Sequence, residues 1–266
     1  MPFNDRIFAL WAHEHDTQVC GKCIPKFVIE PGEQANVDVL FLTFNPARPK
    51  RVSRKFRDWM QNAGWGIDFR ERFSWENSCL RLGYDQPEAD LSAQIHHVAR
   101  SFYPRFFRRL NDVAQAIGMQ PHLHLGVEMY DYAHLDLYLW LDSSSQSITS
   151  RIREDHRVAA FGQAQKEITF ELLQAWRPKT IICPYKIVRP DVECFCRRLG
   201  AAPGFQQMPG GFQKIQTAKV VLPWGPASIV VCQNLLSARG AIGVNPQQFP
   251  IVRDAVAQHV RTFLGK

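Results

Sequence analysis

The sequence lacks the long apolar runs of a membrane protein and the cysteine pattern of a disulfide-bonded secreted domain. No apolar stretch approaches the roughly 20 residues that a transmembrane helix needs, and acidic residues interrupt the start of the chain, where a signal peptide would be continuously apolar. The seven cysteines are an odd number, and most of them stand inside apolar runs, as buried free thiols do. We therefore expect a cytoplasmic protein that makes no contact with a membrane.

Several common functional motifs are also missing. The chain has no G-x-x-x-x-G-K-[ST] phosphate-binding loop, no G-x-G-x-x-G dinucleotide fingerprint, no G-x-S-x-G nucleophile elbow and no internal repeat. These absences argue against an NTPase, a dinucleotide-dependent enzyme and an α/β hydrolase. The chain has 266 residues, of which 45% are hydrophobic, and this is enough for one large core. Basic residues outnumber acidic ones by 32 to 25, which favours a polyanionic partner.

Apolar runs and amphipathic stretches alternate along the chain. Strands are predicted at residues 37–44, 123–129, 180–183, 220–222 and 228–232, and helices at 104–117, 158–176, 190–199 and 252–263. This alternation predicts an α/β fold, with a mostly parallel central sheet flanked by helices on both faces. We expect a single domain over residues 1–266, with a helical insertion rich in basic and aromatic residues at about 48–120.

In sheets of this kind, ligands bind beyond the carboxyl ends of the strands. Four segments follow the predicted strands there, at residues 43–47, 128–134, 184–186 and 233–240. Because parallel strands end at the same edge of a sheet, we expect these segments to converge.

Two of these segments resemble motifs of the uracil-DNA glycosylase superfamily. PGEQANVDVLFLTFNPA at residues 31–47 resembles the first motif, in which a strand leads into an Asn-Pro loop, and SIVVCQNLLSARG at 228–240 resembles the last strand with its H-P-S or N-P-S loop. Two positions depart from the pattern: Thr43 replaces glycine, and Asn234 replaces the usual histidine and lacks the following proline. The resemblance implies a uracil-DNA glycosylase-like fold and a monomeric enzyme that acts on a nucleotide flipped out of DNA.

The resemblance makes two asparagines the candidate catalytic residues. The amide of Asn45 can hold the attacking water by accepting and donating hydrogen bonds, although it cannot take the water's proton fully. Asn234 can donate a hydrogen bond to the base carbonyl oxygen on which negative charge develops as the base departs. The alternatives are that Asn45 caps a turn and that Asn234 bonds only to backbone.

The candidate base pocket contains the aromatic rings of Phe44 and Phe56 and the carboxylates of Glu128 and Asp131. A carboxylate accepts a hydrogen bond from the exocyclic amine of cytosine but opposes the O4 acceptor of uracil. The substrate is therefore either a uracil-type lesion or a hypermodified cytosine, as in foreign or phage DNA. The alternative is that both carboxylates are solvated loop residues.

A basic run follows the first motif directly. Its candidate phosphate contacts are Arg48, Lys50, Arg51, Arg54 and Lys55, and the last loop adds Ser237 and Arg239. Such a run can also be a solvated face. Leu235 and Leu236, in the same loop, either insert into the duplex as an apolar wedge or pack in the core. The expected partner is DNA, as a duplex with a flipped base or as a single strand.

Cys20 and Cys23 have the spacing of a metal knuckle and precede the first motif, as the cysteines of the iron-sulfur branches of the superfamily do. Either zinc or an iron-sulfur cluster would suit the pair. The alternative is two free thiols and no cofactor.

The working hypothesis is a monofunctional DNA glycosylase that hydrolyses the N-glycosidic bond of a damaged or modified pyrimidine and leaves an abasic site. A non-catalytic nucleic-acid-binding module on the same scaffold is the main alternative, which the substitutions at Thr43 and Asn234 would permit. A small-molecule nucleoside or nucleotide hydrolase is a third, for which the basic run would be unnecessary.

Overall fold

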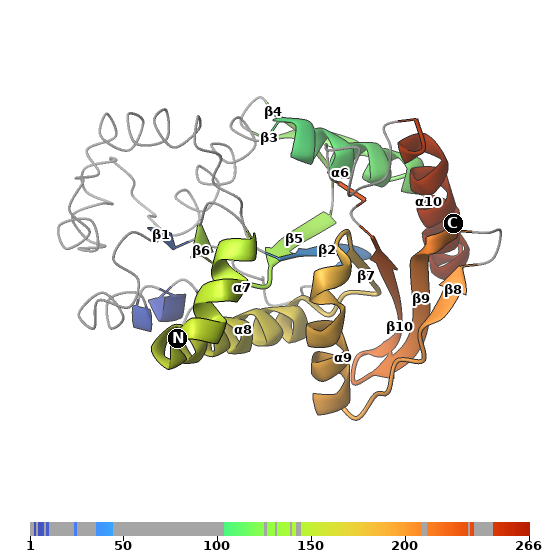
Figure 1. Ribbon diagram of the computed structural model, residues 1–266. Helices are drawn as coiled ribbons and strands as arrows, with labels where there is room; N and C mark the ends of the chain where they lie inside the picture. The colour runs from blue at the N-terminus through green and yellow to red at the C-terminus, as the bar shows by residue number, and fades with distance from the viewer. Residues whose placement is uncertain are drawn as a thin grey trace. The chain divides into compact units, whose positions relative to one another are not determined.

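The computed structural model describes most of the second half of the chain and parts of the first half (Figure 1). The described residues are 3, 5–7, 9–10, 24–25, 36–44, 104–124, 127–130, 132–138, 140–141, 145–208, 212–233, 235–236 and 247–266. The chain divides into two compact units. The first contains residues 1–30, 45–102 and 136–172, and the second contains 31–44, 103–135 and 173–266.

A six-stranded sheet runs through the second unit. Its spatial order is β5 (Tyr132–Asp136), β2 (Val39–Thr43), β7 (Thr180–Cys183), β10 (Gly225–Cys232), β9 (Phe212–Leu222) and β8 (Gln206–Met208). β2, β7 and β10 are mutually parallel, whereas β9 runs antiparallel to both β10 and β8. Every residue of β2 and β7 is buried, as expected for central strands covered on both faces. The sheet is therefore mostly parallel, and the α/β prediction is confirmed at this level.

One face of the sheet is covered by α6 (Pro104–Ile117) and α10 (Phe249–Leu264). The Ser228 hydroxyl on β10 lies 3.0 Å from Nε2 of His259 on α10. Tyr132 on β5 packs edge-on against Phe41 and donates its hydroxyl to Asn111 of α6 at 3.0 Å. The two helices also touch each other, since the guanidinium of Arg109 lies 4.8 Å from the Phe249 ring centroid.

The opposite face is covered by α9 (Arg189–Arg198), which follows the short 3-10 helix η1 (Lys186–Val188). Arg189 donates a hydrogen bond to the side-chain oxygen of Gln216 on β9 at 2.7 Å. Gln216 pairs with Val231 on β10. Because Val231 is three residues after Ser228 on the same strand, its side chain lies on the face opposite to that of Ser228. Phe195 packs against Trp224 at 6.4 Å between ring centroids. Helices on both faces of the sheet are thus observed within the second unit.

The predicted strand at residues 123–129 is wrong. Residues of this run pair with each other, as the antiparallel strands β3 (Pro121–His124) and β4 (Val127–Tyr130) of a separate two-stranded sheet. The strand that joins the main sheet is β5, in which buried Ala133 and Leu135 alternate with the half-buried Tyr132 and His134. A short apolar run cannot by itself distinguish a hairpin arm from a central strand, because pairing partners are not encoded in hydrophobicity alone.

The predicted helices are present and end where the sequence indicates. Gly118 follows α6 with φ of 89° and Gly200 follows α9 with φ of 78°, a left-handed conformation that glycine adopts without steric cost. The second predicted helix, α8 (His156–Trp176), ends just before Arg177-Pro178. None of the helices within the described ranges is long and apolar enough to span a membrane.

The first unit contains the short pair β1 (Ile24–Pro25) and β6 (Trp140–Leu141), α7 (Ser145–Glu154) and most of α8. α8 has close neighbours at Gly162, where a Cβ atom would lie 3.1 Å from Tyr138 and 3.2 Å from Ile152 of α7. The expected helical insertion at 48–120 lies outside the described residues except for its last part, which is α6.

Candidate functional site

The order of the parallel strands marks one position at the carboxyl edge of the sheet. In chain order they are β2, β5, β7 and β10, but in space β5 and β7 lie on opposite sides of β2. β5 runs parallel to β2. Tyr132 contacts Phe41, and two residues further along each strand His134 contacts Thr43. The direction of strand addition therefore reverses between β2 and β7. Crevices at such reversals, beyond the carboxyl ends of the strands, are where open α/β sheets bind ligands.

Thr43 ends β2 at this reversal and joins it to β5. Its side chain is 2% exposed, and its hydroxyl oxygen lies 3.1 Å from Nε2 of His134 and 3.5 Å from the carbonyl oxygen of Leu135. The His134 ring also packs on Phe106 of α6, at 5.6 Å between centroids. Thr43, which departs from the glycine of the resembled motif, therefore has a structural role that glycine lacks. Phe44, a candidate pocket residue, follows it and is 8% exposed.

The carboxyl ends of β7 and β10 are tied together by backbone. The amide of Leu235 donates a hydrogen bond to the carbonyl oxygen of Pro184 at 2.8 Å. Two of the four segments that were expected to converge, 184–186 and 233–240, thus meet at this bond. In the other two, Thr43 and His134 meet through their side chains.

The η1 turn follows Pro184 and is anchored at both ends. Val188 is fully buried, and its amide donates to the carbonyl oxygen of Tyr185 at 3.2 Å. At the far end Arg189 donates to Glu193 at 2.7 Å and lies over the Phe205 ring at 4.6 Å, in addition to its bond with Gln216. These contacts fix the turn to α9 and β9.

The outward residues of this turn are Lys186, which is exposed, and Ile187, which is 45% exposed. Sequence reasoning included Lys186 in a converging segment but gave it no role, and it missed Ile187 and Arg189. No sequence signal identifies the partners of Arg189, since Gln216 and Phe205 reach it only through the fold.

The structure places few of the other candidate residues. Leu235 is fully buried and Leu236 is 4% exposed, which fits the core-packing alternative rather than a wedge into DNA. Glu128 lies in β4, in the small hairpin and not at the exit of a main-sheet strand, because the second parallel strand is β5. The remaining candidates lie outside the described residues: Cys20, Cys23, Asn45, Arg48, Lys50, Arg51, Arg54, Lys55, Phe56, Asp131, Asn234, Ser237 and Arg239.

Buried thiols lie near this edge but are poor nucleophiles or metal ligands. Burial raises the pKa of Cys232 to about 12 and that of Cys196 to about 11, and it raises the pKa of Cys183 well above its ordinary value. Because the thiolate is the reactive and metal-binding form, these thiols are inert at neutral pH. Within the described parts of the chain, no group of three or more His, Cys, Asp or Glu side chains is placed to hold a metal ion.

Comparison of the chain with protein-family models, with curated proteins and with solved structures finds no match.

Proposed function

We propose that the protein is a monofunctional DNA glycosylase, which flips a damaged or modified pyrimidine out of DNA and hydrolyses its N-glycosidic bond. One observation supports this most: the strand order reverses at the carboxyl ends of β2 and β7, and the resembled motifs run into that edge. Asn45 is the next residue in the sequence after Phe44, and Asn234 directly precedes Leu235, whose amide bonds Pro184.

The spacing of the strands suits two amides that act on one base. β2 and β10 are separated only by β7, and neighbouring strands lie about 4.8 Å apart, so the two strands that lead to these loops are roughly 10 Å apart. Side chains from both loops can therefore approach the same small planar group. Asn45 would hold the water that attacks C1′ of the sugar, and Asn234 would donate a hydrogen bond to the departing base.

The charge of the chain fits a polyanionic substrate. The net charge is +7, and the run after the first motif supplies cations for the phosphates beside a flipped nucleotide. A nucleoside hydrolase would have no use for this run.

Base release from defined duplexes tests the proposal. The purified full-length chain is incubated with duplexes that carry uracil, a thymine mismatch, or a hydroxymethylated or glucosylated cytosine. The DNA is then treated with alkali, which breaks the strand at abasic sites. Strand breaks at one of these bases are expected. Binding without breaks would instead indicate a non-catalytic nucleic-acid-binding module, and release of base only from free nucleosides would indicate a small-molecule hydrolase.

A further inference from the structure

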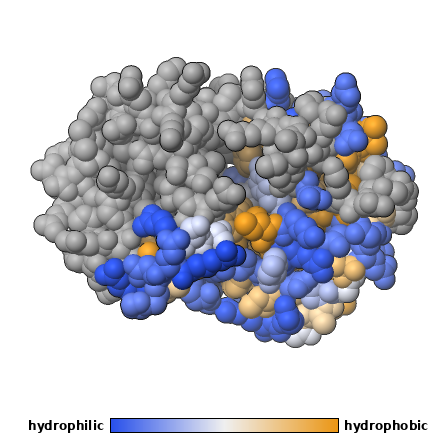
Figure 2. Space-filling view, viewed as in Figure 1, coloured by the Kyte–Doolittle hydropathy of each residue, from blue (hydrophilic) through white to orange (hydrophobic). Residues whose placement is uncertain are grey.

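Polar side chains are buried at few places among the described residues. Figure 2 shows hydrophilic residues, with smaller apolar patches between them, on the face in view, where such side chains are expected. The buried polar residues in the described ranges are Thr43, Asp136, Gln165, Thr169, Thr180 and Ser228. Two of these residues meet a histidine through their hydroxyls: Thr43 Oγ1 lies 3.1 Å from Nε2 of His134, and Ser228 Oγ lies 3.0 Å from Nε2 of His259. The molecule therefore contains the same kind of bond twice.

The first of these bonds lies at the end of β2. β2 pairs with β7 over Val39–Phe41, so Thr43 lies two residues beyond the last of these pairs. The Thr43 hydroxyl also donates to the carbonyl oxygen of Leu135 at 3.5 Å. A hydroxyl donates one hydrogen and accepts at its oxygen, so it can bond Leu135 and His134 at the same time. Both bonds hold the end of β2 against β5.

The imidazole that bonds Thr43 is itself held by α6. Side chains alternate between the two faces of β5, so Tyr132 and His134 share a face. Tyr132 donates its hydroxyl to Asn111 of α6 at 3.0 Å, and the His134 ring packs on Phe106 of the same helix at 5.6 Å between centroids. Supporting contacts of this kind keep a side chain within about 0.5 Å of one position.

The position of Thr43 affects the candidate catalytic amide. Asn45 is the second residue after Thr43 in the sequence, and the proposed reaction needs its amide at one place beside C1′ of the sugar. Displacement of a positioned group by 1 Å can lower a rate about 100-fold. The glycine of the resembled motif has no hydroxyl with which to fix this end of the strand.

We propose that His134 is a positioning residue of the reaction, which acts through the Thr43 hydroxyl on the place of the Asn45 amide. The histidine does not touch the substrate. It fixes the backbone from which the Asn45 loop begins. The inference rests on the proposed function, because Asn45 has a catalytic role only in that reaction.

The second hydroxyl–imidazole bond supplies a matched control. Ser228 pairs with Thr180, the first residue of β7, so the Ser228–His259 bond lies at the amino end of the parallel strands. It also joins a buried hydroxyl on a strand to Nε2 of a part-buried histidine. Loss of either bond should therefore lower stability by a similar amount. Only the Thr43–His134 bond lies at the edge from which the Asn45 loop begins.

The test measures single-turnover base release from whichever of the duplexes above the full-length wild type acts on. His134→Phe keeps an aromatic ring beside Phe106, and Thr43→Val keeps the shape of threonine, but each removes the bond. Each is expected to lower the maximal rate about tenfold, a fraction of the cost of a full 1 Å displacement. The protein concentration that gives half of the maximal rate should not change, because the interaction with the ground-state duplex is intact.

Two further variants show whether the histidine acts through the hydroxyl. The double variant with both His134→Phe and Thr43→Val should be no slower than the slower single variant, because both changes remove one bond. Thr43→Ser keeps the hydroxyl and should recover most of the rate lost in Thr43→Val. Additive rate losses in the double variant would overturn the inference, since the two residues would then act separately.

The controls are Ser228→Ala and His259→Phe. They are expected to lower the midpoint of thermal unfolding as much as the carboxyl-end variants do and to keep the wild-type maximal rate. If His134→Phe fails to fold, Thr43→Val alone decides the question against Ser228→Ala.

The outcomes separate this inference from the proposed function. If the wild type releases base and the carboxyl-end variants turn over as fast as the two controls, the positioning role is overturned and the glycosylase survives. If the wild type releases no base from any duplex, the proposed function fails and the positioning role fails with it. A rate loss confined to the carboxyl-end variants, at equal loss of stability in all four, supports both.

Discussion

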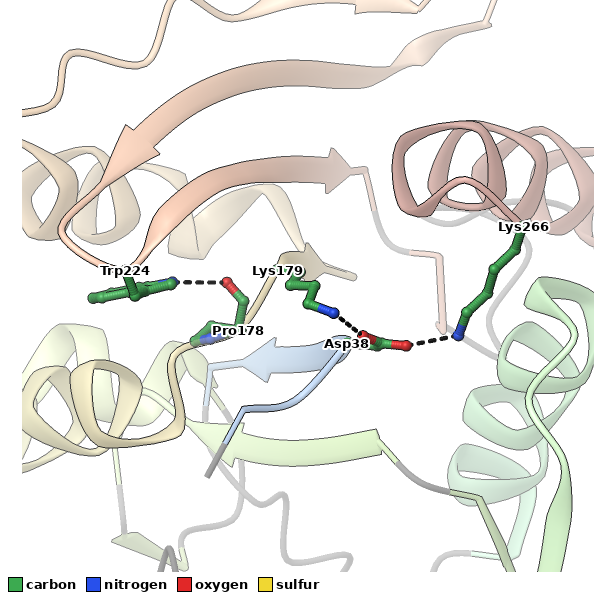
Figure 3. A network of polar contacts seen from close by, with 5 residues as sticks. All are labelled: Asp38, Pro178, Lys179, Trp224 and Lys266. Atoms are coloured by element: carbon green, nitrogen blue, oxygen red, sulfur yellow. Dashed lines mark hydrogen bonds and ion pairs between the residues drawn. The ribbon is translucent and has the colours of Figure 1, made fainter. Parts of the chain in front are cut away.

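The two ends of the parallel strands use their polar groups differently. At the amino end the groups bond one another: Asp38 accepts from Lys179 at 2.9 Å and from Lys266 at 2.6 Å, and the Trp224 indole donates to the carbonyl of Pro178 at 3.1 Å (Figure 3). These contacts connect the start of β2 with the start of β7, the β9–β10 turn and the end of α10. Side chains of the protein thus bridge the elements that meet at the amino end.

At the carboxyl end, among the described residues, the Thr43 hydroxyl meets the His134 ring, and the other bonds hold the turn and loop backbones. The Leu235 amide binds Pro184, and Arg189 fixes the end of η1, while Lys186 and Ile187 remain at the surface. The difference indicates that ion pairs between side chains contribute to stability at the amino end, among the residues that the structure describes. Substitutions at the amino end should therefore change stability, and substitutions at the carboxyl end should change activity.

The largest effect is expected at the carboxyl end, from Asn45→Ala or Asn234→Ala. Loss of one positioned hydrogen-bonding group in an active site typically lowers the rate about 100-fold or more. We expect a loss of that size in single-turnover base release for each variant, with an unchanged urea midpoint.

The matched control is Gln233→Ala, which truncates an exposed amide next to Asn234. It should keep near wild-type turnover. An Asn45→Ala variant with full turnover would exclude the proposed catalytic role, even if the protein proved to be a glycosylase.

At the amino end, two buried hydroxyls that face each other across β7 and β10 should respond in opposite directions. Ser228→Ala removes the partner of His259 and should lower the free energy of unfolding by about 1 kcal/mol. Thr180 is fully buried, and its hydroxyl oxygen has no hydrogen-bond partner among the described residues, so Thr180→Val should leave the stability unchanged or raise it by up to about 1 kcal/mol. Urea unfolding measures both, and a loss of stability in Thr180→Val would contradict this account.

His259 should make the stability of the amino end depend on pH. Burial and the charge of Lys219 lower the pKa of His259, so the unfolded chain takes up its proton more readily than the folded chain. The contribution of His259 to the free energy of unfolding is therefore fully present above its unfolded pKa of about 6.5. As the pH falls below that value, this contribution decreases by at most about 1.4 kcal/mol per pH unit. Urea unfolding at pH 7.5 and pH 5.5 should show a smaller decrease in Lys219→Gln than in the wild type. An equal decrease in the two proteins would contradict the electrostatic part of this explanation.

Much of the fold could be predicted from the sequence, because local signals determine it. The run 180–183 is the strand β7 without adjustment, and proline and glycine mark the ends of α6 and α9. The β3–β4 hairpin was missed, since the run 123–129 has the composition of a buried strand and its pairing depends on the rest of the fold. β9 begins well before the predicted strand 220–222. Its amino-terminal part pairs with β8, and that part of the sequence has no hydrophobic pattern from which a strand could be predicted.

The candidate site was predictable only as a location. That Thr43 ends one parallel strand and that Pro184 directly follows another at the same edge is expected from parallel topology, which the alternation of strands and helices indicates. The exposure of Ile187 and the burial of Leu236 could not be predicted from the sequence. Both are apolar residues in turns after strands, and only the packing around them distinguishes them. The contacts of Arg189 with Gln216 and Phe205 are likewise non-local.

The smallest effect is expected from Asp38→Asn, which removes the shared partner of Lys266 and Lys179 at the amino end. Hydrogen bonds from Lys266 and Lys179 lower the pKa of Asp38, so its contribution is present above the unfolded pKa of about 3.9 and is lost as the pH falls below that value. Because the carboxylate is partly exposed, the loss at pH 7 should be only about 0.2–1 kcal/mol. It should shrink further in 1 M salt, which screens exposed charges over about 3 Å. Urea unfolding at low and high salt measures this, and base release should not change. A loss of base release at unchanged stability would show that the amino end also takes part in function, and the contrast between the two ends would no longer hold.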